Sequence, residues 1–144
     1  MELAQSGYIF FGKYPDPVTL AYLATRGVQL IVNLTSSVYT CNIKIINYPI
    51  KDGGIPDNLM TFSALIAQLK AAIEQSTFIF IHCDHGRGRT GLTVASLIGK
   101  YKNYKYRAAI TELNKQYHKG YGKGRREDIP SHREQKHFVR KFLK

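Results

Sequence analysis

Cysteine is scarce in this sequence, which has only Cys41 and Cys83 among its 144 residues. Small secreted domains are usually held together by several disulfide bonds, and two cysteines in a chain of this length do not make such a framework. The low cysteine content therefore argues against a disulfide-stabilised secreted protein. It predicts an intracellular, cytoplasmic location.

Long apolar runs are also missing. No run approaches the roughly 20 residues that a membrane-spanning helix needs, so no transmembrane segment is predicted. Residues 1–11 contain Glu2 and no basic segment, which does not fit a secretory signal peptide. We find no internal repeat, low-complexity tract or linker, and the length and the 44% apolar content suit one domain over residues 1–144.

Acidic residues are few, because 10 Asp and Glu stand against 21 Lys and Arg, giving a formal net charge of +11. The basic excess is heaviest after Lys100 and includes Lys123, Arg125 and Arg126 in a glycine-rich turn. These residues form either an ordinary solvated basic face or a surface that attracts a polyanion, such as a phosphoprotein, a phosphoinositide headgroup or an RNA 5′ end. Tyrosines interleave with the lysines here, which keeps a nucleic-acid partner open.

Strand-like and helix-like segments alternate along the chain. Strands are predicted where short apolar runs end at a turn, and helices where apolar residues recur every three or four positions. In chain order we expect strand 8–12, helix 17–24, strands 28–34 and 43–50, helix 57–75 with Asp57 as its N-cap, strand 78–82, and helices 90–100, 107–116 and 134–143. This order predicts a single α/β layered domain with a central, mostly parallel sheet of four to five strands flanked by helices.

The most informative segment is IFIHCDHGRGRTG, residues 79–91. A strand that turns sharply into a helix points its turn amides inward, and together with the helix dipole these amides form a cradle for an anion. Arg89 can donate two hydrogen bonds to one bound oxyanion. The same positive field favours the thiolate form of Cys83, and a thiolate aimed at a bound phosphate is a nucleophile for phosphoryl transfer.

A structural cysteine or a metal site could also account for some of these residues. A structural cysteine in a strand, followed by chance basic residues, does not require Arg89 and Thr90 at these spacings. A metal site built from the four adjacent residues is possible by ligand type, but neighbours at a strand end point in alternating directions and lack a spaced second pair of ligands. The ligands of this rejected metal site would be His82, Cys83, Asp84 and His85. The favoured interpretation requires neither a metal nor a cofactor.

These residues resemble the signature of the cysteine-dependent protein tyrosine phosphatase superfamily, which is His-Cys, five residues, Arg, then Thr or Ser. The opening Gly-Tyr-Ile-Phe-Phe-Gly, a helix and then Gly-Val-Gln-Leu-Ile-Val-Asn-Leu is similar to the small dual-specificity phosphatases, and the likeness extends over residues 7–143. The resemblance implies a protein tyrosine phosphatase-like fold. It also implies hydrolysis of phosphotyrosine, and of phosphoserine or phosphothreonine, in protein substrates through a phosphocysteine.

The resemblance also implies the role of each residue in the segment. Cys83 is the nucleophile, Thr90 assists departure of its sulfur, and His82 orders the loop and tunes the thiol. The phosphate is held by the loop after the nucleophile, which comprises Asp84, His85, Gly86, Arg87, Gly88 and Arg89.

A general acid must protonate the leaving oxygen, because an unprotonated serine or tyrosine oxyanion departs poorly. In the family an Asp about thirty residues before the nucleophile does this from a mobile loop, and the segment 48–57 resembles that loop. We predict that Asp52 is the acid and that Gly53 and Gly54 act as hinges. An ordinary Asp-Gly turn is the alternative for Asp52, and Asp57 is the rival acid.

Two departures from the family pattern concern the substrate. Asp84 places a negative charge beside the anion site, and Arg87 adds a second cation where many relatives carry an apolar residue. A basic residue at the place of Arg87 resembles lipid phosphatases, and His85 resembles RNA 5′-phosphatases. An RNA 5′-triphosphatase or phosphoinositide phosphatase therefore stays open as an alternative. A catalytically inactive phosphate-binding module is the second alternative, although Cys, Arg and acid are all present.

The remaining features stay unassigned. Residues 131–138 resemble the glutamine-containing segment that begins the last helix of larger tyrosine phosphatases, but Ser131 stands where the water-positioning glutamine would be and Gln135 matches a later one. Cys41 is either a buried apolar residue or a partner that traps oxidised Cys83 as a disulfide.

Overall fold

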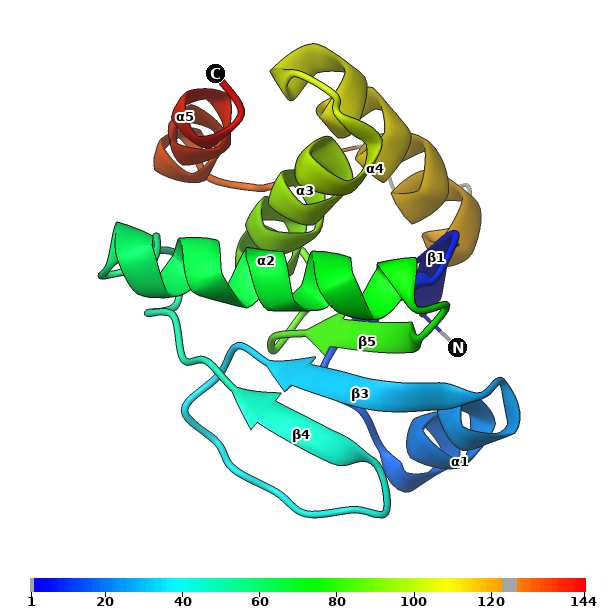
Figure 1. Cartoon of the computed structure of the whole chain (residues 1–144). Coiled ribbons are helices and arrows are strands. Elements are labelled where there is room, and N and C mark those ends of the chain that lie inside the picture. Colours follow the sequence, from blue (N-terminus) through cyan, green and yellow to red (C-terminus); the bar gives the residue numbers. More distant parts are fainter. Residues whose placement is uncertain (1, 123–126) are drawn as a thin grey trace.

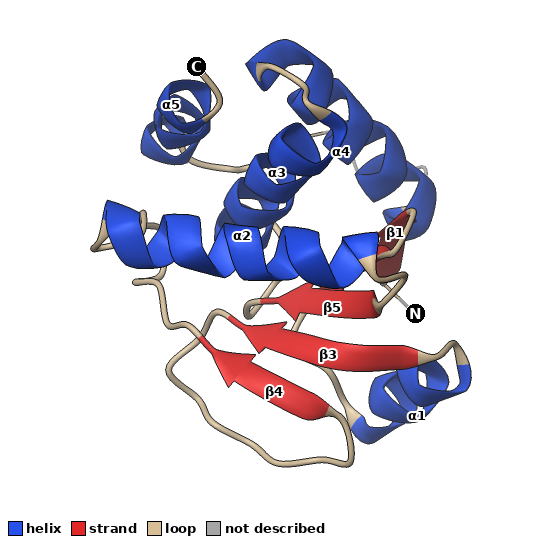
Figure 2. Ribbon diagram, viewed as in Figure 1, coloured by secondary structure: helices blue, strands red, loops and turns tan. Residues whose placement is uncertain are grey.

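The computed structural model describes residues 2–122 and 127–144, so the basic turn predicted at Lys123, Arg125 and Arg126 lies outside the described residues. Five strands form one sheet (Figures 1 and 2). Their spatial order is β1 (Leu3–Ser6), β2 (Ile9–Gly12), β5 (Phe78–His82), β3 (Val28–Asn33) and β4 (Lys44–Asn47). The β1–β2 pair is antiparallel and the other pairings are parallel.

Helices cover both faces of the sheet. They are α1 (Pro17–Thr25), α2 (Leu59–Glu74), α3 (Gly88–Lys102), α4 (Tyr106–Tyr121) and α5 (Arg133–Phe142). The larger core lies between the sheet and helices α2 to α5, and the smaller core lies under α1 on the opposite face. Figure 1 shows this asymmetry, with α1 apart from the other helices. Residues 89–99 of α3 are all buried, because this helix runs through the middle of the larger core.

The centre of the sheet sets the place of the site. The last residues of three neighbouring parallel strands are in register, because His82 of β5 lies opposite Gly12 of β2 and Asn33 of β3. The loops that follow these strands therefore meet at one edge. In open α/β sheets this carboxyl edge is where ligands bind, and the segment 83–87 rises from its middle.

The α/β fold with a mostly parallel sheet is confirmed, and the structure adds an element that sequence analysis missed. Strand β1 is only four residues long, so its pattern gives a weak signal. One capping prediction was wrong. The N-cap of α2 is Asn58, not Asp57, because the helix begins at Leu59 and the Asn58 side chain accepts a hydrogen bond from the Thr61 amide at 3.0 Å.

We also asked whether the chain offers a helix for a bilayer. Within residues 2–122 and 127–144, none of the helices combines the length and the apolar character that crossing a membrane requires.

Candidate active site

Where β5 leads into α3, the carbonyl groups of residues 82–84 accept hydrogen bonds from groups outside the turn. The carbonyl of His82 accepts a hydrogen bond from the Leu34 amide at 3.0 Å, and that of Asp84 accepts one from the Tyr14 amide at 3.1 Å. Between them the Cys83 carbonyl lies 3.2 Å from Nδ1 of His82. A trans peptide group holds its C=O and the next N–H in opposite directions, so the amides that follow these carbonyls point into the turn. The backbone thus builds an anion cradle.

His82 is a fixed neutral ring in this arrangement. It is fully buried, and burial lowers the pKa of His82 to about 4. The Cys83 carbonyl can only accept, so Nδ1 carries the proton and donates to it. The unprotonated Nε2 then accepts from the Tyr39 hydroxyl at 2.9 Å. Burial raises the pKa of Tyr39, which keeps this hydroxyl protonated as a donor. The Tyr14 ring packs edge-on against His82, with ring centroids 5.1 Å apart.

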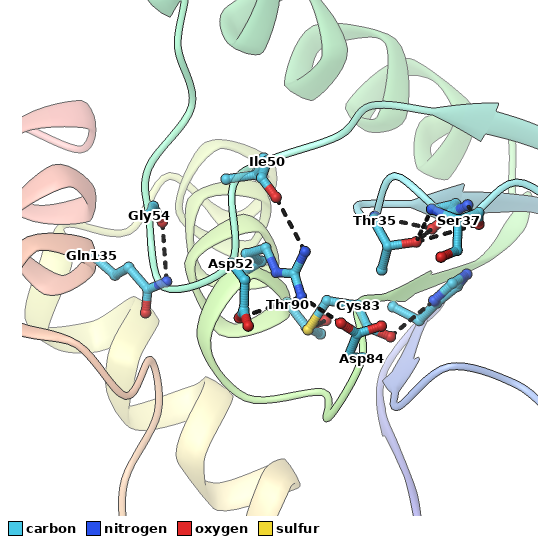
Figure 3. Close-up of polar contacts among 12 residues, drawn as sticks. Thr35, Ser37, Ile50, Asp52, Gly54, Cys83, Asp84, Thr90 and Gln135 are labelled. Atoms are coloured by element: carbon cyan, nitrogen blue, oxygen red, sulfur yellow. Dashed lines mark hydrogen bonds and ion pairs between the residues drawn. The ribbon is translucent and has the colours of Figure 1, made fainter.

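Cys83 lies at the base of the cradle, where its side chain is buried. The Thr90 hydroxyl comes from the first turn of α3 and donates a hydrogen bond to Sγ of Cys83 at 2.9 Å (Figure 3). A donor at this distance stabilises negative charge on sulfur. The contact brings together the two residues that sequence analysis predicted as nucleophile and helper.

Arg89 presents its buried guanidinium to the same cradle. Its Nη1 donates to the Ile50 carbonyl at 3.1 Å, which fixes the plane of the group. Its Nη2 faces two carboxylates, at 3.1 Å from Asp84 Oδ2 and 3.4 Å from Asp52 Oδ1 (Figure 3). Both carboxylates are at least half exposed, with side-chain exposures of 51% for Asp84 and 84% for Asp52. A bound phosphate would meet Arg89 beside them.

The loop that carries Asp52 is tied to the start of α5. Gly53 has a positive φ of +74°, which favours glycine, and its Cα faces the His132 ring. The next carbonyl, that of Gly54, accepts a hydrogen bond from Nε2 of Gln135 at 3.0 Å (Figure 3). These contacts place Asp52 over the cradle. They give Gln135 a structural contact in a site for which the sequence assigned it no role.

A cavity of about 160 Å³ opens between this loop, the cradle and the segment before α5. It has room for a small anion and the atoms bonded to it, well below the size of a drug-sized pocket. Its lining residues are Asp52, Gly53, Cys83, His85, Arg87, Gly88, Arg89, Ser131 and His132. Asp57, the rival acid, does not line it.

Two glycines of the cradle allow its close packing. Gly86 has φ +76°, and a Cβ there would lie 2.5 Å from the backbone carbon of Gly12. A Cβ at Gly88 would lie 3.0 Å from the side-chain amide of Gln135. A side chain at Gly86 would clash with the Gly12 backbone, so this glycine has a steric reason, whereas a side chain at Gly88 would require the Gln135 amide to shift.

Sequence analysis missed four residues that shape the site. Tyr14 and Tyr39 fix His82, and His132 lines the cavity. Asn33 is fully buried at the end of β3, where its Oδ1 accepts hydrogen bonds from the amide and hydroxyl of Thr35 at 3.0 and 2.8 Å. The sequence offered a signal for two of them, because Asn33 ends the predicted strand 28–34 and His132 lies in the segment 131–138, whereas Tyr14 and Tyr39 come from loops without a motif.

Cys41 is a half-buried free thiol whose Sγ lies 3.4 Å from the Ile43 carbonyl. Its pairing with Cys83 on oxidation stays a prediction. Within the described part of the chain, no three His, Cys, Asp or Glu side chains cluster in a way that could hold a metal ion.

Known proteins with similar sequences point to one family. The family model described as Dual specificity phosphatase, catalytic domain, matches residues 9–143. Protein 067L of Invertebrate iridescent virus 3, named as a tyrosine phosphatase, is 34% identical over 119 residues, which are 75% of this chain and 49% of that protein. The chain spans less than half the length of the curated relatives it matches.

Solved structures share the fold. A mouse protein described as a dual specificity phosphatase, crystallised with zinc tungstate, has a TM-score of 0.81 at 15% identity, covering 99% of this chain and 86% of that chain. TpbA of P. aeruginosa, as a cysteine-to-serine variant in complex with pTyr, has a TM-score of 0.70 at 20% identity, covering 99% and 90%. At these identities the likeness shows the fold.

Proposed function

The chain belongs to the dual-specificity phosphatase family, and on that premise we propose that it hydrolyses phosphate monoesters in proteins through a phosphocysteine intermediate. The proposed substrates carry phosphotyrosine, and also phosphoserine or phosphothreonine. We propose that residues 1–144 form one catalytic domain. A thiolate nucleophile needs reducing conditions, which supports an intracellular, cytoplasmic location.

One observation carries the proposal. A buried thiol receives a hydrogen bond from Thr90, and the same small cavity holds the guanidinium of Arg89 and the carboxyl of Asp52. A phosphate bound to Arg89 and the loop amides would place its phosphorus above Sγ of Cys83. This constellation supplies an anion site, a nucleophile and a proton donor, which are the three parts that monoester hydrolysis requires.

The proposed chemistry has two steps. In the first, the Cys83 thiolate attacks phosphorus, the P–O bond to the substrate breaks, and the Asp52 carboxyl gives its proton to the departing oxygen. In the second, water attacks the phosphocysteine while the Asp52 carboxylate takes a proton from it. The P–S bond then breaks and releases inorganic phosphate. Thr90 stabilises the returning thiolate through its hydrogen bond to Sγ.

An assay panel tests the proposal. We expect release of inorganic phosphate from a phosphotyrosine peptide and from a phosphoserine peptide, measured with a colorimetric phosphate assay. An inositol polyphosphate and a triphosphate-ended RNA complete the panel. Turnover of the last two alone would replace the protein phosphatase proposal with the phosphoinositide or RNA alternative.

Arg87 supports that second candidate function, hydrolysis of a multiply phosphorylated substrate. It lines the cavity, and its Nε is buried without a hydrogen-bond partner among the described residues. A second phosphate of a substrate in this cavity would meet the Arg87 side chain where it lines the wall, together with His85 and His132.

We therefore expect Arg87→Leu to weaken turnover of an inositol polyphosphate and a triphosphate-ended RNA about tenfold more than that of a simple aryl phosphate, because one charge-assisted hydrogen bond contributes about 1.5–3 kcal/mol. Steady-state kinetics measure the difference, which should narrow as added salt screens exposed charges beyond about 8 Å. Equal losses on all substrates would leave Arg87 as a support of the cradle and would favour a plain protein phosphatase.

A further inference from the structure

A groove of about 1180 Å³ lies outside the active-site cavity, between α5 and the start of α2. Figure 1 shows α5 beside the N-terminal end of α2. We call it the α5 groove and define it by its apolar floor and its basic rim. The floor comprises Ile55, Leu59, Phe138 and Phe142, and the rim comprises Lys100, Arg133, Lys136, Arg140 and Lys141.

The floor offers apolar surface to a ligand. Phe138 and Phe142 rest on the buried ring of Phe62 in α2, with ring centroids 5.3 and 5.2 Å apart. Beside them Leu59 is 59% exposed and Ile55 is 38% exposed. Exposed apolar residues gathered in one concave surface indicate a binding site more often than isolated ones do.

The rim has charge of one sign. Five cations border the groove and Glu134 is the acid among its lining residues. Within residues 2–122 and 127–144, no carboxylate lies within ion-pair distance of any of the five. Two of them lie over aromatic rings instead, Arg140 at 4.5 Å from the Tyr106 centroid and Lys100 at 4.9 Å from the Phe142 centroid. The rim therefore presents positive charge to an anionic ligand.

The groove and the active-site cavity are lined by different residues of the same two segments. Ser131 and His132 line the cavity, and the next residue along the chain, Arg133, lines the groove. The loop opposite does the same, because Gly53 lines the cavity and Ile55 lines the groove. A substrate chain whose phosphate sits over the cradle can therefore continue from one into the other.

We propose that the α5 groove binds an acidic segment of the phosphoprotein substrate, with one apolar side chain on the floor, directly beside the phosphorylated residue. This inference rests on the proposed function and names the substrate class more closely. The 10 residues of α5 extend about 15 Å, which matches about four or five residues of an extended peptide. The rim supplies charge complementarity, and the two segments that line both the cavity and the groove supply the path.

The floor favours a peptide over RNA or a membrane. RNA bases stack on open aromatic faces. Here Phe138 and Phe142 stack on each other at 5.9 Å, and Lys100 lies over Phe142. A bilayer surface is broad and flat, so it would meet the rim and leave the recessed floor empty. Ring edges and aliphatic side chains in a groove suit the side chains of a peptide.

The first test compares phosphotyrosine peptides. One set of peptides has four acidic residues and one leucine next to the phosphotyrosine, and the other set has four neutral residues and the same leucine. In each set the flank is placed on one side of the phosphotyrosine or on the other. We expect the acidic flank on one side to raise kcat/KM about tenfold through a lower KM, because each exposed ion pair contributes a factor of up to about five. Added salt should reduce the gain. Equal kcat/KM for acidic and neutral flanks at low salt would overturn the inference.

Matched variants locate the effect. We expect Lys136→Ala with Lys141→Ala to remove most of the acidic-flank gain and to leave turnover of an aryl phosphate unchanged. The control, Lys115→Ala with Lys119→Ala, removes the same charge from exposed positions of α4 and should keep the gain. An equal loss in the control would mean a general charge effect and would contradict the groove.

A second pair of substitutions tests the apolar floor. Leu59→Ala should lower kcat/KM severalfold for both leucine-containing peptides, whereas Met60→Ala, at a neighbour that is 82% exposed and does not line the groove, should not. Equal effects of the two substitutions would contradict a role for the floor.

Binding to the Cys83→Ser protein, followed by fluorescence anisotropy of the same labelled peptides, separates this inference from the proposed function. Tighter binding of the acidic peptide without turnover by the wild-type chain would contradict the function and support the groove. Turnover without any preference between flanks would support the proposed function and contradict the groove. Anionic vesicles or an oligonucleotide could instead bind more tightly than the acidic peptide. If the Lys136→Ala, Lys141→Ala protein loses that binding, the peptide is overturned as the occupant of the groove.

Discussion

Replacing Cys83 with serine is expected to lower kcat by roughly six orders of magnitude, the size of loss seen when the nucleophile of a covalent mechanism is removed. Only the attacking atom changes, so the cradle amides, Arg89 and the Thr90 hydroxyl stay in place to bind phosphate. Phosphate release from a phosphotyrosine peptide measures the loss. Competition by inorganic phosphate against a labelled substrate peptide measures the binding that should remain.

The chain provides a matched control for this substitution. Cys41→Ser makes the same atomic change at the other free thiol, which is half-buried in the loop between β3 and β4, and should keep turnover close to wild type. Turnover by Cys83→Ser at the wild-type rate would contradict the phosphocysteine mechanism. A chelator should leave the wild-type enzyme active, and its inactivation would bring back the metal hypothesis. If wild type binds phosphate but turns nothing over, the inactive module becomes the better proposal.

Local sequence decided much of the candidate site. Cys83 directly follows strand β5, and Arg89 and Thr90 both lie in the first turn of α3, so their spacing alone brings thiol, guanidinium and hydroxyl to one cradle. The parallel sheet was equally accessible, because a strand buried on both faces is a continuous apolar run.

Contacts between distant loops were not accessible in the same way. Tyr39 reaches His82 across 43 positions and Gln135 reaches Gly54 across 81, and neither contact has a spacing that a pattern could reveal. Asp84 shows a second limit. Its place in the loop was evident, but only the fold decides that its half-exposed carboxylate lies 3.1 Å from Arg89 Nη2.

The two carboxylates beside Arg89 lie in different parts of the site. Asp84 follows the nucleophile directly and belongs to the cradle itself, whereas Asp52 belongs to the glycine-flanked loop above it. Asp52 lines the active-site cavity, and Asp84 is not among its lining residues. We therefore propose Asp52, and not Asp84, as the proton donor, and this proposal leads to the second large effect.

Asp52→Asn is expected to lower kcat by roughly two to four orders of magnitude on a phosphoserine peptide, because its alkoxide cannot leave without a proton. The loss should be much smaller on an aryl phosphate with a strongly electron-withdrawing ring, whose oxyanion departs unaided. Asparagine keeps the size of the side chain, so the loop and its contact through Gly54 should persist. Steady-state kinetics on the two substrates give the ratio that identifies proton donation.

Asp57→Asn is the matched control, since it neutralises an exposed carboxylate of the same loop that does not line the cavity, and it should leave both rates unchanged. If Asp52→Asn loses equally on both substrates, the residue acts by positioning the loop through its ion pair with Arg89, and the proton must come from elsewhere. A large loss in Asp57→Asn confined to the poor leaving group would transfer the role to that residue. The leaving-group dependence, more than the size of either loss, therefore decides which carboxyl is the acid.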